Sequence, residues 1–352
     1  MSEPGWIEGC RWQATQCVAL GSPFSAGLLT AAADGDLGPL EDLFAAWEGQ
    51  SLGKHIREAT PLRLLGALHH LVLTSEAPAL AALYPETFPD ADWPAVLSAA
   101  REVLKTRRPA IAAFMASPPQ TNEVGRSLCL APGFLRVAAE TGLPLSILEI
   151  GSSAGLNLRW DGYRYDFGGK PWGDPASPVL LAGDWQGPPP SQAPAVVVAA
   201  RAACDQSPID ITRDEAALRL QAYVWADQPA RMARLRGAIA VARSTSASLA
   251  KADAADWVAA NLSPTEGVAT VLFHSVMWQY MPQRTQNAVS EAIAAAATKA
   301  TRTAPLAHLS MEPDPSREGF PMAVQLTIWP DGRSFHLADV HPHGAWVRWL
   351  VD

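Results

Sequence analysis

The spacing of apolar residues divides the chain into two parts with different patterns. From the N-terminus to about residue 140, apolar residues recur every three or four positions, as in the segments 38–49, 60–76 and 90–117. This period is typical of amphipathic helices. Thr60-Pro61 suits the start of a helix, and Pro109 interrupts the third segment. We therefore predict a helical N-terminal domain or cap over residues 1–140.

After Pro144 the pattern changes to short apolar runs that alternate with helix-like segments. The candidate strands are 145–150, 195–200, 267–276 and 304–311, and the candidate helices are 214–243 and 283–300. This alternation predicts a mainly parallel sheet covered by helices on both faces. Two more apolar runs, 323–329 and 334–340, flank an Asp-Gly hairpin signal. We predict an α/β domain over residues 141–352 whose parallel sheet ends in an antiparallel hairpin, with a Pro/Gly-rich insertion at about 160–194.

Composition narrows the class of protein. Hydrophobic residues make up 48% of the 352 residues and charged residues 18%, which is enough apolar material for a large core. The formal net charge of −8 argues against a general nucleic-acid binder. The four cysteines are scattered and contain no C-x-x-C pair, which favours reduced, buried thiols. No apolar run is long enough for a membrane helix, and the N-terminus lacks a signal-peptide pattern, so we expect a cytoplasmic protein.

The segment SILEIGSSAGLN (146–157) allows two interpretations. As G-x-S-x-G it is a nucleophile elbow, with Ser153 as the nucleophile of a serine hydrolase. The alternative is a cofactor loop, in which Gly151 and Gly155 permit a tight turn close to a ligand and Glu149 accepts hydrogen bonds from it. The elbow requires an upstream oxyanion loop, and the sequence before Ser153 shows helical patterns instead. We therefore favour the cofactor loop.

Acidic residues and a histidine follow the later strands. Asp205 follows the second run, with Asp210 as a competing acid. Asp253-Ala254 follows a third segment, and His274 lies near the end of the strand 267–276. In open α/β sheets, ligands bind beyond the carboxyl ends of the strands. These positions therefore predict a small-molecule site at one edge of the sheet. Each acid also has an ordinary alternative as a turn or helix-cap residue, and His274 as a hydrogen-bonded core residue.

Together these segments resemble the successive motifs of the Rossmann-fold S-adenosylmethionine-dependent methyltransferases: E-x-G-x-x-x-G, D-x-S-P, D-A and a strand ending in a polar residue. Over nearly its whole length the chain also resembles the bacterial family called domain of unknown function 2332. That second resemblance rests on the segments RWQA (11–14), TNEVGR (121–126), LEIGSSAGLNL (148–158), SPIDIT (207–212) and WADQPARMARLR (225–236).

The methyltransferase resemblance implies S-adenosylmethionine as cofactor and assigns residues to it. The cofactor residues are Glu149, Gly151, Ser153, Gly155 and Asn157 in the first loop, Asp205 at the ribose, and Asp253 and Ala254 at the adenine. Ser153 and Asn157 have helix capping as an alternative role. Asp205 lies 54 residues after Gly151, against roughly 20 in a dinucleotide-binding unit.

The remaining polar residues are assigned to chemistry and to substrate. His274 is the preferred general base, because an imidazole titrates near neutrality, and Glu312 is the reserve. The candidate substrate residues are Asn122, Glu123, Arg126 and Tyr163, although Glu123 and Arg126 also suit a salt-bridged helix start. No cluster calls for a metal. The sequence thus predicts a methyltransferase for a small-molecule acceptor, with a cofactor-binding protein that transfers no methyl group and a serine hydrolase as alternatives. The oligomeric state stays open.

Overall fold

The computed structural model describes residues 3–84, 92–190, 195–317 and 321–351. The chain forms two compact units. Unit 1 comprises the described residues up to Thr121 together with Thr212–Ala233, and unit 2 comprises Asn122–Ile211 and the described residues from Arg234 onward. The expected division at residues 140 and 141 therefore needs two corrections. Helix α8 (Arg126–Thr141) packs on the sheet of unit 2, and a segment from the second half of the chain belongs to unit 1.

Unit 1 is helical, as the apolar spacing predicts. Its helices are α1 (Gly5–Ala19), α2 (Pro23–Ala33), η1 (Glu41–Trp47), α3 (Leu52–Arg57), α4 (Thr60–Leu73), α5 (Pro78–Ala81), α6 (Trp93–Thr106), α7 (Arg108–Met115), α9 (Asp214–Ala222) and the first residues of α10 (Pro229–Ser244). Proline occupies the first turn of α2, α4, α5, α6 and α7, where its missing N–H costs no hydrogen bond. Pro109 separates α6 from α7, in agreement with the predicted interruption.

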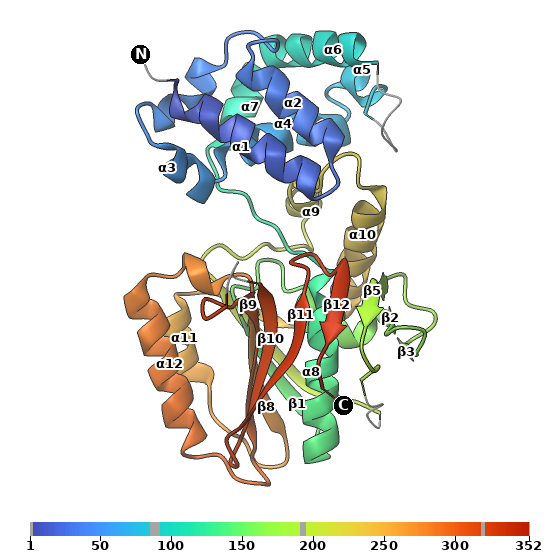
Figure 1. Ribbon diagram of the computed structural model, residues 1–352, viewed down its shortest axis with the longest axis vertical. Coiled ribbons are helices and arrows are strands. Elements are labelled where there is room, and N and C mark those ends of the chain that lie inside the picture. Colours follow the sequence, from blue (N-terminus) through green and yellow to red (C-terminus); the bar gives the residue numbers. More distant parts are fainter. Residues whose placement is uncertain (1–2, 85–91, 191–194, 318–320, 352) are drawn as a thin grey trace. The chain divides into compact units, whose positions relative to one another are not determined.

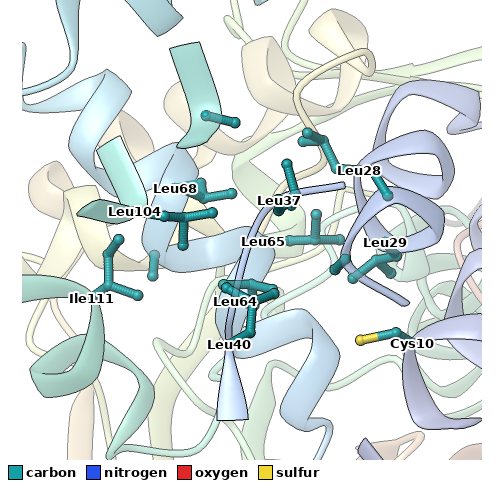
Figure 2. Close-up of a cluster of buried hydrophobic side chains, with 14 of the residues drawn as sticks. Cys10, Leu28, Leu29, Leu37, Leu40, Leu64, Leu65, Leu68, Leu104 and Ile111 are labelled. Atoms are coloured by element: carbon teal, nitrogen blue, oxygen red, sulfur yellow. The ribbon is translucent and has the colours of Figure 1, made fainter. Parts of the chain in front are cut away.

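The core of unit 1 is a single cluster of buried apolar side chains. Figure 2 shows its central leucines, among them Leu29, Leu64 and Leu68, which are at most 1% exposed, beside Cys10. The cluster also contains Ala222 and Tyr223, which belong to Thr212–Ala233, the segment that returns to unit 1 from the second half of the chain and is called the returning segment below. Burying a leucine side chain contributes about 2 kcal/mol, so the returning segment adds to the core that holds unit 1 together.

Hydrogen bonds fix the returning segment within unit 1. The backbone N–H of Phe24 donates to Asp227 (2.9 Å), and the His69 imidazole bonds the Val224 carbonyl (2.8 Å). The guanidinium of Arg219 donates to the Phe114 carbonyl (2.9 Å) and stacks over the Phe114 ring. These bonds satisfy polar groups that the segment buries, which explains why it folds with the N-terminal helices.

Unit 2 is built on a nine-stranded sheet in the order β5-β12-β11-β10-β9-β8-β1-β6-β7 (Figure 1). Its strands are β1 (Leu145–Ile150), β5 (Asp184–Gln186), β6 (Val198–Asp205), β7 (Ser248–Lys251), β8 (Ala269–Ser275), β9 (Leu306–Pro313), β10 (Met322–Trp329), β11 (Arg333–Val340) and β12 (Trp346–Trp349). The five strands β7, β6, β1, β8 and β9 lie side by side in this order and are parallel to one another. Next to β9, each of β10, β11 and β12 is antiparallel to the strand before it. The predicted α/β class, with a mainly parallel sheet and a C-terminal hairpin, is confirmed.

Helices cover both faces of this sheet (Figure 1). Helices α11 (Ala254–Asn261) and α12 (Gln283–Ala297) pack on one face through a cluster that includes Leu148, Ile150 and Leu272. Helix α8 packs on the other face, where the Phe134 ring meets Phe273 edge-on. A side chain at Gly133 would lie 2.5 Å from Leu309, so the close approach of α8 requires glycine there.

The Pro/Gly-rich insertion is folded. It contains the 3-10 helix η2 (Asn157–Gly162), then β2 (Arg164–Asp166), β3 (Pro171–Gly173) and β4 (Leu180–Ala182), which form a small sheet in the order β3-β2-β4. Strand β5 joins the main sheet beside β12. The last residues of the insertion, 191–194, lie outside the described residues. Strands of three residues carry too little periodicity for the sequence to reveal them.

The state of the cysteines and the length of the helices match what the sequence predicts. All four cysteines are buried and free of disulfides, and burial raises the pKa of the Cys10 thiol to about 12. In the described part of the chain, every helix is too short or too polar to cross a membrane.

Candidate functional site

Several of the predicted residues, among them Glu149, Asp205 and His274, lie at the carboxyl edge of the sheet near the end of β1. Strand β1 lies between β6 on one side and β8 on the other, and the chain proceeds from β1 to β6 and β7 before returning to β8 and β9. Such a reversal of strand order is a topological switch point, where open α/β sheets bind ligands. Counted along the chain, the five parallel strands β1, β6, β7, β8 and β9 occupy positions 1 to 5 of the doubly wound strand order 3-2-1-4-5-6. The antiparallel strand β10 occupies position 6.

The loop after β1 is a tight turn. Gly151, Ser153 and Gly155 all have positive φ angles, of 70°, 52° and 64°. The Gly151 N–H donates to the Cys204 carbonyl (2.9 Å), which fastens the start of the loop to β6. The loop leads into the 3-10 helix η2 (Asn157–Gly162). The loop therefore presents backbone groups at the switch point without the dipole of an α-helix behind them.

Asp205 holds this loop in place. Its two carboxylate oxygens accept hydrogen bonds from the backbone N–H groups of Ser153 and Ser207, each at 2.8 Å. The N–H of Ile209 also donates to the Ser153 carbonyl (3.1 Å). A carboxylate has about four acceptor positions, so Asp205 retains capacity for a ligand hydroxyl while it shapes the loop. Although the long insertion separates Asp205 from the loop in the sequence, the fold places Asp205 next to the loop.

Glu149, near the end of β1, has a different environment. Its side chain is 2% exposed, and its Oε2 atom has no hydrogen-bond partner among the described residues. Burial raises the pKa of this carboxyl well above its usual value, and the nearby Arg159 guanidinium offsets part of that effect. A buried acceptor without a partner costs about 1–3 kcal/mol. Such a group at a switch point indicates a position that a ligand donor completes.

Two asparagines of the predicted site support the loop. Asn122 accepts a hydrogen bond from the Leu156 backbone N–H (2.8 Å). Asn157, which is 1% exposed, accepts one from the Ser127 hydroxyl (2.7 Å). Both amides therefore fix the backbone that follows Gly155. This places them behind the loop in a supporting position.

Glu123 and Arg126 also bond to the backbone. Glu123 accepts from the Gly125 N–H (3.0 Å). Arg126 donates to the carbonyls of Ser275 (3.1 Å), at the end of β8, and Pro342 (3.2 Å), after β11. Arg126 thereby ties the start of α8 to two strand ends at the carboxyl edge of the sheet.

Two other predicted residues, Tyr163 and Asp253, have structural partners. Tyr163, assigned to substrate, is fully buried, and its hydroxyl donates to the Leu156 carbonyl (2.7 Å). Asp253 caps α11 by accepting from the Ala255 N–H (2.9 Å), and Ala254 is 8% exposed. Asp253 thus adopts the helix-cap alternative, and burial removes Tyr163 from the surface that a substrate reaches.

His274 and Glu312 form a direct pair. The His274 Nδ1 atom lies 2.8 Å from Glu312 Oε1, and its Nε2 atom lies 3.1 Å from Nε2 of His308. Burial and the neighbouring His274 lower the pKa of His308 to about 3, so His308 stays neutral at physiological pH. The Trp278 ring stacks on His274, with 5.0 Å between centroids. Both ring nitrogens of His274 are therefore occupied.

The available oxygen of this cluster belongs to Glu312. Its Oε1 atom also accepts from the N–H groups of Met277 (3.1 Å) and Trp278 (3.3 Å). Its Oε2 atom has no partner among the described residues. His274 therefore orients the carboxyl group of Glu312, whose Oε2 atom keeps a lone pair without a partner in the described structure.

Glu149 and the His274 cluster lie on opposite faces of the sheet. Glu149 is paired with Phe273 in the register of β1 and β8, and directly paired residues share a face. His274, the next residue of β8, points the other way, and Glu312 follows the same alternation on β9. A ligand that touches both carboxylates must therefore lie across the edge of the sheet.

Met277 covers the loop between these two groups. A side chain at Gly151 would lie 2.8 Å from the Met277 Cγ atom. The preceding residue, Val276, has a φ of 52°, which is unfavourable for a β-branched side chain. A ligand that approaches Gly151 therefore displaces the flexible Met277 side chain.

Ser153 shares one feature with a nucleophile elbow and lacks another. Its positive φ and its buried Oγ, which has no partner in the described part of the chain, fit a strained turn. A serine nucleophile also needs a base within hydrogen-bond reach, and the described residues place no histidine on this hydroxyl. The turn is followed by a 3-10 helix, whereas an elbow leads into an α-helix.

Two residues of the site, Arg159 and His308, were not predicted from the sequence. Arg159 is 5% exposed and donates to the Gly155 carbonyl (2.7 Å), so it stabilises the end of the loop. His308 could have been found, because His308, Ser310 and Glu312 alternate with apolar residues along one strand. Alternation with period two places them on one face.

Among the described residues, no group of three or more His, Cys, Asp and Glu side chains could hold a metal ion. A family model described as an uncharacterized protein conserved in bacteria, domain of unknown function 2332, matches residues 8–349. No curated protein and no solved structure matches the chain.

Proposed function

Since the chain belongs to this bacterial family of uncharacterized proteins, we propose from the chemistry of its own site that it is an S-adenosylmethionine-dependent methyltransferase for a small-molecule acceptor. The observation that carries the proposal is the buried Glu149 carboxyl, whose Oε2 atom lacks a partner at the switch point of the sheet. S-adenosylmethionine offers an ammonium group to such an acceptor, and its positively charged sulfur carries the methyl group that the acceptor's nucleophile takes up.

The loop residues suit this cofactor better than a dinucleotide. Glu149 would accept from the ammonium group, and the nearby cation would favour the ionised carboxylate. Asp205, beside the loop, has acceptor capacity left for ribose hydroxyls. The loop has no α-helix after it to attract a pyrophosphate. A cationic ligand needs no such helix.

Glu312 would act as the base in this proposal. S-adenosylmethionine would supply the methyl group and leave as S-adenosylhomocysteine, and the proton of the acceptor's nucleophile would pass to the Oε2 atom of Glu312, which has no partner among the described residues. His274 holds the other oxygen at 2.8 Å, and the neutral His308 fixes His274 from behind. Positioning and removal of one proton are the main contributions that methyl transfer asks of a protein.

Calorimetric titration with S-adenosylmethionine and S-adenosylhomocysteine tests the proposal. We expect saturable micromolar binding that Glu149→Gln weakens about tenfold, as expected for loss of a charge-assisted hydrogen bond. Glu291→Gln, at an exposed position on α12, is the matched control and should leave binding unchanged. Absence of binding at millimolar cofactor would overturn the proposal.

The same experiment separates the two alternatives. Cofactor binding without any methylated product across a panel of small nucleophiles would favour a binding protein without methyl transfer. If the cofactor does not bind, labelling of Ser153 by a fluorophosphonate probe, absent in Ser153→Ala, would favour the serine hydrolase.

A further inference from the structure

A cluster of cations surrounds a buried carboxylate at the end of β11. Asp339 is 2% exposed and bonds both terminal nitrogens of Arg317, one of them at 3.1 Å. It also bonds Arg348 and, at 2.9 Å, the imidazole of His336. The Arg317 guanidinium is the main reason that the pKa of Asp339 lies well below its usual range. Asp339 is thus a fixed anion that orients two arginines.

The two guanidinium groups keep donors and charge beyond what Asp339 uses. The side chains of Arg317 and Arg348 are 37% and 53% exposed. Among the described residues, Nε and Nη1 of Arg348 and Nε of Arg317 have no hydrogen-bond partner. A second acid, the half-buried Asp314, lies close to Arg317, so Asp339 and Asp314 together balance the charges of the two arginines.

The cluster lies in one row with the proposed base. Glu312 on β9 pairs with Ala323 on β10, which pairs with Asp339 on β11, and Arg348 on β12 continues the row. Directly paired residues share a face of the sheet. Two strand spacings of about 4.8 Å separate the backbone of Glu312 from that of Asp339. The methyl side chain of Ala323 is the only one between them in this row.

We propose that Arg317 and Arg348 bind an oxyanion of the acceptor, so that the substrate of this protein is a small acid whose nucleophile lies roughly 10 Å from its carboxylate or phosphate. The substrate class rests on the proposed function, but binding of an oxyanion at the cluster does not. Paired guanidinium groups that a buried carboxylate holds in place match the planar, two-point geometry of oxyanions.

Titration with inorganic phosphate and with malonate at low ionic strength tests this site without any cofactor. We expect saturable millimolar binding of at least one probe, and the preferred probe tells whether the acceptor carries a phosphate or a carboxylate. Arg348→Gln should weaken binding about fivefold or more, and Arg348→Lys should restore only part of it, because lysine lacks the fork of donors. Arg302→Gln, at an arginine that is 86% exposed, is the matched control.

Two results would overturn the inference: no saturable binding of either probe, or an equal loss in Arg348→Gln and Arg302→Gln. A purely structural role for the cluster predicts lower thermal stability of Arg348→Gln with no change in anion binding, so a melting curve accompanies each titration. If the protein binds phosphate or malonate but does not bind the cofactor, the methyltransferase proposal is contradicted and the oxyanion site is still supported.

Discussion

The carboxyl ends of β1 and β11 each carry a buried acid, and the two acids have opposite surroundings. Glu149 on β1 has an oxygen without a partner in the described structure, and burial raises its pKa. Asp339 on β11 bonds two arginines and a histidine, and the Arg317 guanidinium is the main cause of its lowered pKa. The same sheet edge thus contains one buried acid that lacks a donor and one buried acid that has several donors.

In the proposed function, this difference separates a binding position, Glu149, from a structural one, Asp339. Asp339 is complete without a ligand, and its arginines extend outward from it. Glu149 is incomplete, and the polar groups around it, including Asp205, hold the loop and leave its Oε2 atom unbonded. A ligand that supplies a donor gains the most at the incomplete acid, because that group loses its desolvation cost on binding.

The largest effect on stability is expected for Asp339→Asn. The change leaves two arginines around a neutral amide and should cost about 2 kcal/mol at pH 7, below the 3–5 kcal/mol of a fully buried pair because both guanidinium groups keep contact with water. The folded-state pKa of Asp339 is depressed, so its stabilisation is present above the unfolded value of about 3.9 and is lost as pH falls through the folded value.

Urea unfolding at pH 7 and at pH 3 measures this effect, and the gap between wild type and variant should narrow at pH 3. Asp36→Asn, at an exposed aspartate of unit 1, serves as control. A loss below about 0.5 kcal/mol at pH 7 would show that the cluster is only a set of weak surface pairs.

Glu149→Gln should have the opposite sign. The raised folded-state pKa means that the stabilisation is full below the unfolded value of about 4.3 and is lost as pH rises through the folded value. The amide cannot ionise, so we expect the variant to be more stable by about 1 kcal/mol at pH 8, while it binds the cofactor less tightly. The two unfolding curves at pH 5 and pH 8 test it, and equal gaps at both pH values would contradict the pKa shift.

An effect of about the same size as that of Glu149→Gln is expected near the third acid, Glu312, through His274 and His308. His308→Phe removes the partner of His274 Nε2 and should cost about 1 kcal/mol at pH 7. His308 contributes stability above its unfolded pKa of about 6.5, and that stability is lost as pH falls toward its folded value of about 3. Wild type should therefore lose more stability than the variant between pH 7 and pH 5. His308→Gln, which keeps a hydrogen-bonding group, separates the bond from the titration.

Much of the fold could be predicted from the chain alone. Apolar runs bounded by proline and glycine locate β1, β8, β10 and β11 to within two residues, because these strands are buried and regular. The positions of Glu149, Asp205, His274 and Glu312 at one edge follow from the parallel sheet, in which strand ends meet.

Other features depend on contacts between distant segments. Alternation along a strand cannot tell which face of β1 matches which face of β8, so the separation of Glu149 from His274 needed the register. The role of His274 depended on His308, which lies 34 residues away. The segment 212–233 is amphipathic in either unit, and only its partners Phe24, His69 and Phe114 decide where it packs.

The return of this segment to unit 1 sets an order of events during synthesis. The N-terminal helices receive Ala222 and Tyr223 into their core only after the ribosome has made the first loop, the insertion and strand β6. Domains normally fold in the order in which they emerge. Here the first unit to emerge must wait for chain that is made after part of the second, so its nascent helices remain open to chaperones or proteases until residue 233 has left the exit tunnel.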